Sequence, residues 1–322
     1  MNSFHVFAID TPWAVGKVNC YLIEDDPLTL IDTGPNTGTA IVELEASLAS
    51  VGRRLADIER IVVTHQHADH CGLAAILAHV TEAEVCCLDE LVPWLSEGPE
   101  SMRRDDEFAA ALMRRHGVSK EAVTTLRAVS GNFRAFGPGP VQVGTALTHG
   151  GTLGFAGRSL RVWHRPGHSP TCTIFHDEAT GELFGGDHIL GNISSNPLVS
   201  RGPHTAEGER PNALRAYIAS MRETAAMDIT TVLPGHGNPV LDVAPLVEKR
   251  IDAHEKRAAK IAQMLEDGPR SAYELARTMW RAIALQQAFL TLSEVLGHLD
   301  LLVERGEVVE DDSGDVTRFA LV

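Results

Sequence analysis

Residues 61–72 read IVVTHQHADHCG, so an apolar run leads directly into three histidines and an aspartate. In an extended chain, side chains two positions apart point the same way, so His65 and His67 can converge on one point. A turn beginning at Asp69 would direct Asp69 and His70 toward a second point nearby. Imidazole and carboxylate groups at this density suit Zn²⁺ or a similar borderline ion. The alternative is a polar loop whose histidines hydrogen-bond with one another.

Three further polar side chains favour the metal site, because each lies in a turn after another apolar run. His168 lies in RPGHSP after RVW, Asp187 lies in FGGDH after ELF, and His236 lies in LPGHG after TTV. Taken singly, each is typical of a structural side chain at a strand end. In an α/β sandwich such turns can meet at one edge of the sheets, so together they favour a metal site over a hydrogen-bonded polar loop.

The pattern of apolar and polar residues predicts an α/β fold. Short apolar runs alternate with helical periodicity through the first third of the chain, and the polar DDP at 25–27 predicts a hairpin between two strands. In that third we expect strands over 18–25, 28–34, 58–64 and 83–89, and helices over 37–52 and 71–80. Short strands return after residue 150, followed by a helix over 213–227, a strand over 228–237 and a long charged helix over 247–268.

Two segments depart from this alternation. An insertion at about 95–145 contains two amphipathic helices broken at Gly117, and it forms either a lid over the site or ordinary surface packing. The last fifty or so residues predict two helices and a two-stranded hairpin, which is the winged-helix order. We therefore expect a catalytic domain over 1–245, and a linker helix plus a winged-helix-like module over 246–322.

The charge of the chain disfavours nucleic acid as a partner. Its 322 residues carry a formal net charge of −15, whereas a polyanion needs a basic face. From residue 269 onward there are five arginines, no lysine and nine acidic residues, so the C-terminal module is acidic too. We expect this module to pack against the rest of the chain or to form a homodimer rather than to bind DNA. A small-molecule substrate is the expected partner.

Cysteine usage favours a reducing, cytoplasmic setting. The five cysteines are odd in number and include no C-x-x-C pair, which argues against a disulfide framework. The N-terminus MNSFHVFAID has neither a basic start nor a long apolar core, so we expect no signal peptide. No apolar run reaches the length of a membrane span, so we expect no membrane association.

The ordered set DTG, HQHADH, PGHS, GGD and PGHG resembles the motifs of the metallo-β-lactamase superfamily of hydrolases, over roughly residues 5–240. The resemblance implies a four-layer αββα sandwich with a dinuclear metal site at one edge. It implies that His65, His67 and His168 hold the first metal ion. Asp69, His70 and His236 would hold the second ion, Asp187 would bridge the two, and Asp32 of DTG would orient the site by hydrogen bonds.

Finer resemblances concern the branch within the superfamily. HEKRAAKIAQMLEDGPRSAYELA, leading into the winged-helix pattern, is similar to the branch of β-lactamase-like protein 2 and related thioesterases, and GDHILGNISSNP is similar to bacterial glyoxalase-II-like hydrolases. Cys71 and Thr171 stand where glycine or serine and glycine are usual, which affects the shape of the pocket and not the ligand set. Histidine rather than glutamate at position 67 argues against the flavo-diiron branch.

The implied cofactors are two divalent metal ions, Zn²⁺ first, with Mn²⁺ or Fe²⁺ as alternatives. Water bound in such a site has a pKa near 7, so hydroxide is available to attack a carbonyl. Asp69 would steer the hydroxide and carry its proton, and His188 would support Asp187. We therefore expect a hydrolase of a thioester or a carboxylic ester, lactones included. The alternatives are an RNA endonuclease, an iron persulfide dioxygenase with one iron, and a non-catalytic metal-binding protein.

Overall fold

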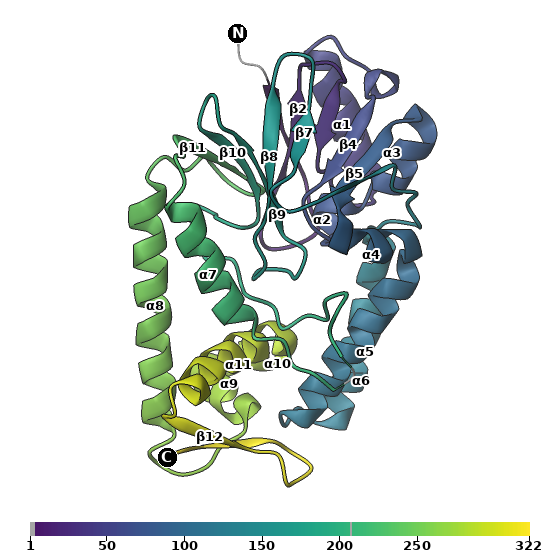
Figure 1. Cartoon of the computed structure of the whole chain (residues 1–322). Helices are drawn as coiled ribbons and strands as arrows, with labels where there is room; N and C mark the ends of the chain where they lie inside the picture. The colour runs from purple at the N-terminus through teal and green to yellow at the C-terminus, as the bar shows by residue number, and fades with distance from the viewer. Residues whose placement is uncertain (1–3, 207) are drawn as a thin grey trace.

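The computed structural model describes residues 4–206 and 208–322. Two β-sheets pack face to face in the upper part of the molecule, with helices on their outer faces, and a group of helices lies below them (Figure 1). The predicted α/β sandwich is confirmed.

The first sheet has the strand order β1-β2-β3-β4-β5-β6. Its strands are β1 (Phe4–Ile9), β2 (Val18–Ile23), β3 (Thr29–Ile31), β4 (Arg60–Val63), β5 (Glu84–Leu88) and β6 (Thr145–Leu147). The predicted hairpin is present, because β2 and β3 pair antiparallel with Tyr21 opposite Ile31. From β3 to β6 the strands run parallel. Both faces of β2 are buried, which explains its unbroken apolar sequence.

The second sheet has the strand order β11-β10-β9-β8-β7. Its strands are β7 (Thr152–Gly154), β8 (Ser159–His164), β9 (Thr173–Asp177), β10 (Glu182–Gly186) and β11 (Thr231–Pro234). Alternate side chains of both sheets point into the layer between them, where Tyr21, Val62, Phe175 and Phe184 belong to one buried cluster. This apolar layer fixes the two sheets against each other.

Helices cover both outer faces and complete the four layers. The helices against the first sheet are α1 (Gly38–Ser50), α2 (Ala68–Cys71) and α3 (Ala74–Thr81); those against the second are α7 (Ala213–Ala225) and α8 (Val243–Met264). Helix α1 begins where the Thr37 side chain accepts a hydrogen bond from the backbone of Ala40, a regular N-cap. The short 3₁₀ helices are η1 (Leu55–Asp57), η2 (Asp89–Leu91) and η3 (Arg134–Phe136).

The insertion and the C-terminal segment form the lower, helical part. The insertion contains α4 (Val92–Glu97), α5 (Pro99–Arg115) and α6 (Lys120–Phe133); the C-terminal segment contains α9 (Ala272–Trp280), α10 (Ile283–Gln286), α11 (Ala288–Glu304), β12 (Val308–Asp311) and β13 (Arg318–Leu321). The predicted break at Gly117 is confirmed, since this glycine adopts a φ of +100° between α5 and α6. The short helix α10 was not predicted.

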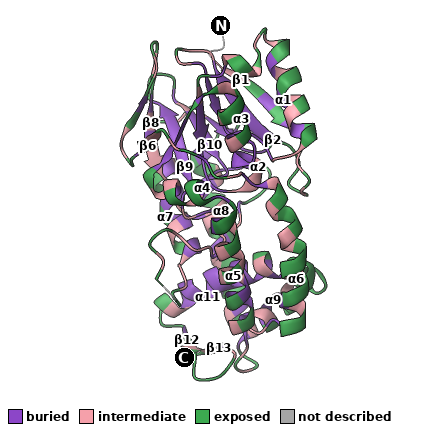
Figure 2. Ribbon diagram, turned by 90° about the vertical axis from the view of Figure 1, so that its right-hand side faces the viewer, coloured by how far each residue is buried: buried purple, intermediate pink, exposed green. Residues whose placement is uncertain are grey.

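One hydrophobic cluster joins the insertion to the C-terminal helices. Leu112 and Met113 of α5 pack in the same cluster as Leu292 and Leu296 of α11. Helix α11 is buried along most of its length, as Figure 2 shows in the lower part of the molecule, whereas the surface of α6 is largely exposed. The insertion therefore shares a core with the C-terminal segment, while the boundary at residue 245 and the winged-helix assignment stay predictions.

None of the helices in the described part of the chain combines the length and the apolar composition that a membrane span requires.

Candidate metal centre

The structure brings all seven candidate ligands together at one edge of the two sheets. The ligands come from the ends of β4, β8, β10 and β11 and from helix α2. They form three overlapping groups in which the ligand atoms lie within 4.8 Å of one another: His65, His67 and His168; His65, His70 and Asp187; and Asp69, His70 and His236. Segments far apart in the chain thus meet at one site.

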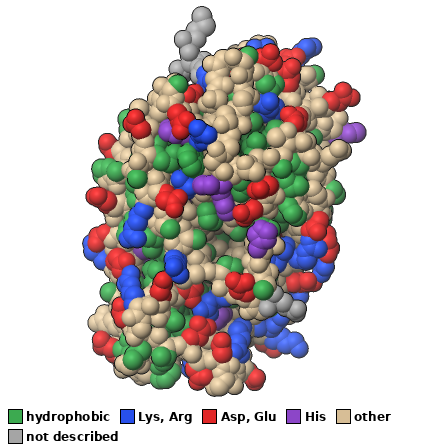
Figure 3. Space-filling view, viewed as in Figure 1, with side chains coloured by type: hydrophobic (Ala, Val, Ile, Leu, Met, Phe, Trp, Pro, Cys, Tyr) green, Lys and Arg blue, Asp and Glu red, His purple; other side chains and the backbone are tan. Residues whose placement is uncertain are grey.

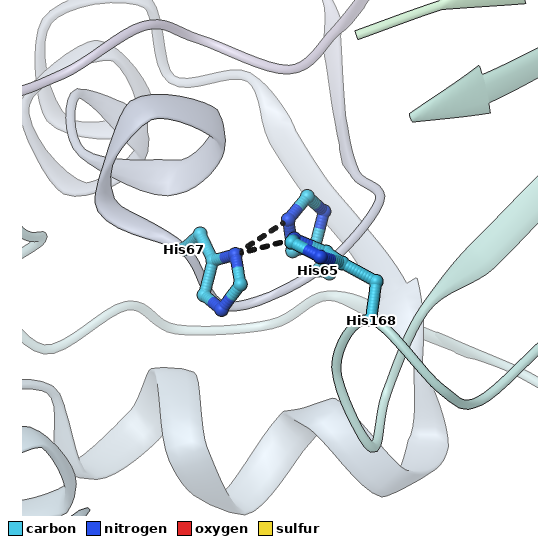
Figure 4. Close-up of side chains that lie close together, drawn as sticks. All are labelled: His65, His67 and His168. Carbon is cyan, nitrogen blue, oxygen red and sulfur yellow. Dashed lines mark hydrogen bonds between the residues drawn. The ribbon is translucent and has the colours of Figure 1, made fainter. Parts of the chain in front are cut away.

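His67 lies at the centre of the first group. Its Nδ1 is 3.1 Å from Nε2 of His65 and 2.9 Å from Nε2 of His168 (Figure 4). Burial lowers the pKa of His67 to about 3, and burial also lowers the pKa of His65 and of His168. All three imidazoles are therefore neutral near pH 7, which is the form that binds a metal ion.

The outer ring nitrogens of this group are already occupied. The Thr64 hydroxyl donates to Oδ2 of Asp32 at 2.8 Å, so its oxygen is free to accept the proton of His65 Nδ1, which lies 3.0 Å away. Nδ1 of His168 lies 3.1 Å from the backbone carbonyl of Asn196 and donates to it. Both histidines consequently present an unprotonated Nε2 atom to Nδ1 of His67. Because that Nδ1 can carry only one proton, it can donate a hydrogen bond to only one of the two Nε2 atoms at a time. A cation at the meeting point would satisfy all three nitrogens.

The group of Asp69, His70 and His236 combines a carboxylate with two imidazoles, and it is called the second group from here on. Nε2 of His236 lies 3.3 Å from Oδ2 of Asp69, and Nε2 of His70 lies 4.0 Å from Oδ1 of Asp69. The opposite ring nitrogens are held in place: Nδ1 of His236 donates to the carbonyl of Lys17 at 2.7 Å, and Nδ1 of His70 donates to Asp32 at 2.7 Å. Such outer hydrogen bonds orient metal-binding imidazoles in known sites.

Asp187 lies between the two groups. Its Oδ1 is 3.3 Å from Nε2 of His70, and its Oδ2 is 3.5 Å from Nε2 of His236 and 3.6 Å from Nε2 of His168. Among the described residues, Oδ1 of Asp187, Nε2 of His70 and Nε2 of His236 are buried without a hydrogen-bond partner. Buried polar atoms rarely stay unpaired, so their convergence fits divalent ions bound by nitrogen and oxygen ligands.

The charges of the site attract cations. Burial would lower the pKa of His236, but the neighbouring carboxylates of Asp187 and Asp69 raise it to about 9. Burial likewise opposes protonation of His70, yet the charges of Asp187 and Asp32 raise its pKa well above the usual value. Conversely, burial would raise the pKa of Asp187, and the positive charge of His70 holds it well below its usual range. In the absence of metal, protonated imidazoles thus supply the positive charge that the carboxylates require.

Asp32 supports both groups from behind. It is 2% exposed, has a φ of +59°, and accepts the backbone N–H of Thr64 at 2.9 Å through Oδ1. Aspartate tolerates this left-handed conformation better than most residues. Through Thr64 it reaches His65, and it contacts His70 directly.

His188 has different contacts from those we expected. Its Nε2 hydrogen-bonds with the Thr224 hydroxyl on α7 at 2.8 Å, and burial lowers its pKa to about 3. Its ring makes no hydrogen bond with a candidate ligand in the described part of the chain. The predicted support of Asp187 by His188 therefore rests on their adjacency in sequence alone.

Cys71 and Gln66 hold the ligand loop together. The Cys71 thiol lies 3.3 Å from the carbonyls of Gln66 and of His67, and burial raises its pKa well above the usual value, so it is a structural thiol. Oε1 of Gln66 accepts the hydroxyls of Ser169 and Thr171, which join the HQH loop to the PGHS loop. Sequence reasoning missed Gln66, although the unusual Thr171 marks one of its partners.

Gly235 allows the His236 loop to pack closely against two candidate ligands. A Cβ atom on Gly235 would lie 2.3 Å from Oδ1 of Asp187 and 2.6 Å from Cε1 of His70. Only glycine therefore fits between the His236 loop and these two ligands. On the other side, the Asn19 amide donates to the carbonyls of Pro234 and Gly237 at 2.9 Å, which ties the same loop to the first sheet.

Another buried group could hold an ion, and the sequence did not predict it. His254 on α8 and Glu294 and His298 on α11 place ligand atoms within 4.8 Å of one another. Nδ1 of His298 donates to the carbonyl of Glu294 at 2.6 Å, and Nδ1 of His254 lies 3.2 Å from Nε2 of His298. The Glu294 carboxylate forms an ion pair with Arg257. Most of these contacts are satisfied within the protein, in contrast to the seven-ligand site.

The comparisons with known proteins agree with this fold and site. The family model for the metallo-beta-lactamase superfamily matches residues 13–236, and the chain belongs to this superfamily. It is 33% identical over 314 residues to a probable metallo-hydrolase, YqjP, of Bacillus subtilis, covering 97% of this chain and 95% of that protein.

Two further relatives differ in how much of the chain they cover. The crystal structure of the metallo-beta-lactamase family protein TTHA1429 from Thermus thermophilus superimposes with a TM-score of 0.81 at 28% identity, over 100% of this chain and 99% of that one. The thioesterase pkgB of Emericella nidulans is 30% identical over 128 residues, which is 40% of this chain and 33% of that protein. The full-length likeness to TTHA1429 includes the C-terminal helices.

Proposed function

We propose that the protein is a metal-dependent hydrolase that cleaves a thioester or a carboxylic ester, lactones included, of a small molecule. The observation that carries this proposal is the position of the Asp187 carboxylate between two groups of ligands. One group consists of His65, His67 and His168, and the other of Asp69, His70 and His236. This arrangement supports a site for two ions rather than one.

The donor set of imidazoles and carboxylates fits Zn²⁺, with Mn²⁺ and Fe²⁺ as alternatives. Two such ions would supply an activated water near neutral pH and an electrophile for a carbonyl oxygen. The protein supplies the orientation: Asp32, Thr64 and the carbonyls of Asn196 and Lys17 fix the ring nitrogens that point away from the site.

Asp69 is the residue we propose to hold and transfer the proton of the attacking water. Its side chain is 14% exposed, compared with 8% for Asp187, so it is the more accessible of the two carboxylates. Its Oδ2 lies 3.3 Å from Nε2 of His236, and its Oδ1 lies 4.0 Å from Nε2 of His70. A carboxylate held in this way can receive a proton during attack and return it to the leaving group.

The surroundings of the site support a small substrate. A cavity of about 390 Å³ is lined by Gly167 and Pro170, which flank His168, and by residues of the 198–213 segment. This volume suits a small molecule, and among the described residues no lysine or arginine lines the cavity. His168 itself is not part of the lining, so the cavity lies beside the ligand loop rather than over the ions. The printed name of the thioesterase relative supports a thioester among the candidate bonds.

Surface charge and the C-terminal segment support further parts of the proposal. Acidic and basic side chains are interspersed on the face shown in Figure 3, and the net charge of −15 speaks against an RNA substrate. We propose a cytoplasmic protein of the β-lactamase-like protein 2 branch, whose C-terminal segment is a winged-helix-like module that packs in the chain or forms a homodimer. The order α9, α11, β12, β13 supports this assignment of the C-terminal segment.

A hydrolysis screen tests the proposal. The zinc-, manganese- and iron-loaded proteins would be assayed on acyl-CoA and glutathione thioesters, homoserine lactones, β-lactams, simple esters and phosphodiesters. Hydrolysis of a thioester, ester or lactone that disappears on chelation and returns with metal is the expected result. Cleavage of phosphodiesters alone would indicate a nuclease, and oxygen uptake with one iron per chain would indicate a dioxygenase; either result would overturn the proposal.

A further inference from the structure

Residues 195–199 touch the candidate metal centre on one side. The Ser195 hydroxyl donates to the backbone carbonyl of Asp187 at 2.5 Å, and the carbonyl of Asn196 accepts the Nδ1–H of His168 at 3.1 Å. This short segment, which is part of the connection from β10 to α7, therefore contacts two of the seven candidate ligands. Its carbonyl contact decides which nitrogen of His168 faces the site.

The same segment is attached to helix α11 on its other side. Nδ2 of Asn196 donates to the carbonyl of Leu290 at 3.1 Å, and the backbone N–H of Val199 donates to the hydroxyl of Ser293 at 3.2 Å. Val199 is fully buried in the hydrophobic cluster that the insertion and the C-terminal helices share. A single residue, Asn196, therefore links the C-terminal segment to the candidate ligand His168 through hydrogen bonds.

Helix α11 is itself firmly held. Gly297 packs so closely on α7 that an added Cβ would lie 2.7 Å from the Cβ of Leu214. Arg210, further along the same connecting chain, forms ion pairs with Asp300 of α11 at 2.5 Å and with Glu310 of β12 at 2.7 Å. The helix can therefore act as a fixed support for the 195–199 segment.

We propose that helix α11 positions the metal ligand His168 through Asn196, so that the C-terminal segment is an integral part of the metal centre. Asn196 is a positioning residue. Its side-chain amide is held by α11, and its backbone carbonyl fixes the orientation of the His168 imidazole. Hydrogen-bond partners of metal ligands typically change metal affinity 10–100-fold when they are lost. The inference rests on the proposed function in one respect, namely that His168 binds a metal ion.

Metal-binding measurements on the full-length protein test this proposal. In Asn196→Leu the side chain keeps its size but cannot donate to Leu290, and in Ser293→Ala the acceptor for Val199 is lost. Competition with a chromophoric chelator would give the affinity of each Zn²⁺ ion, and the absorption spectrum of the Co²⁺ protein would report which site has changed. We expect both variants to weaken one ion by about tenfold or more, the same ion that is lost in His168→Ala.

Arg215→Ala is the matched control. It breaks an exposed ion pair between α7 and α11, from Arg215 to Glu304 at 3.2 Å, without touching the 195–199 segment, and it should keep both affinities. A merely structural role of Asn196 would lower the thermal stability of the metal-free protein and leave both affinities at their wild-type values, which would overturn the inference. Absence of any bound ion in the wild-type protein would instead overturn the proposed function.

Discussion

Oδ1 of Asp187 lies 3.3 Å from Nε2 of His70, and neither atom has a hydrogen-bond partner in the described part of the chain. The other oxygen of the same carboxylate faces His236 and His168, which belong to different ligand groups. One carboxylate thus connects the two halves of the site. If the proposed two ions bind here, the charge of Asp187 should matter more than its shape, because an amide of equal size carries no negative charge to attract them.

Asp187→Asn should therefore lower the affinity for both ions, while His67→Ala should affect mainly one. Elemental analysis after gel filtration should find fewer than two Zn²⁺ ions per chain in Asp187→Asn. In the metal-free protein, the pKa of His70, raised by Asp187 against the effect of burial, should fall, as NMR titration would show. Two tightly bound ions in Asp187→Asn would contradict the bridging role.

His67→Ala should lose the ion of the first group and with it the hydrolytic activity, because Nδ1 of His67 faces both of the other imidazoles in that group. The measurement is metal content together with turnover of the best substrate from the screen. His79→Ala removes an exposed histidine of α3 and should behave as wild type. Full activity in the metal-stripped wild-type protein would sink the mechanism.

Gly235→Ala adds one methyl group and removes no functional group. Because the new Cβ would lie 2.3 Å from Oδ1 of Asp187, the carboxylate must move, and we expect weaker metal binding and lost activity. Overpacking of this kind costs about 1–3 kcal/mol in unfolding free energy. Gly154→Ala, where no atom lies within 4 Å of the added Cβ, is the control. Unchanged metal affinity in Gly235→Ala would contradict the prediction, because it would show that the loop moves to accept the methyl group without displacing Asp187.

Gln66→Leu should destabilise the protein. It leaves the buried hydroxyls of Ser169 and Thr171 without their acceptor, at about 1–3 kcal/mol for each unpaired group. Urea unfolding of the metal-free protein would measure the loss. Thr171→Val removes only one of the two donors and should cost less. Equal stabilities for Gln66→Leu and wild type would mean that water replaces the lost contacts.

The buried histidines of α8 and α11 should make stability dependent on pH. Burial lowers the pKa of His254 and of His298 to about 4, whereas an imidazole in the unfolded chain has a pKa of about 6.5. The unfolded state therefore binds more protons between these values, and the unfolding free energy falls as pH decreases from about 6.5 to about 4. In metal-free protein, His298→Gln should show a shallower decline than wild type, while the exposed His79→Gln should keep the wild-type slope.

Much of the fold could be predicted because its signals are local. The apolar run of β2, the helical spacing of α1 and the break at Gly117 each lie within one short stretch of sequence. The short helix α10 has no comparable local signal. The hydrophobic cluster that joins α5 to α11 was also beyond the sequence pattern, because amphipathic helices show which face is apolar and not which partner covers it.

The sequence by itself determined the candidate ligand types and their order along the chain, since H-x-H-x-D-H and three strand-end turns carry the seven side chains. Only the tertiary structure decided how they meet. It placed Asp187 between the two groups, turned His188 toward Thr224, and connected His168 through Asn196 to helix α11. The physical reason is that the partner of a buried ring nitrogen depends on which distant segments pack together, and strand order and helix packing are properties of the whole chain.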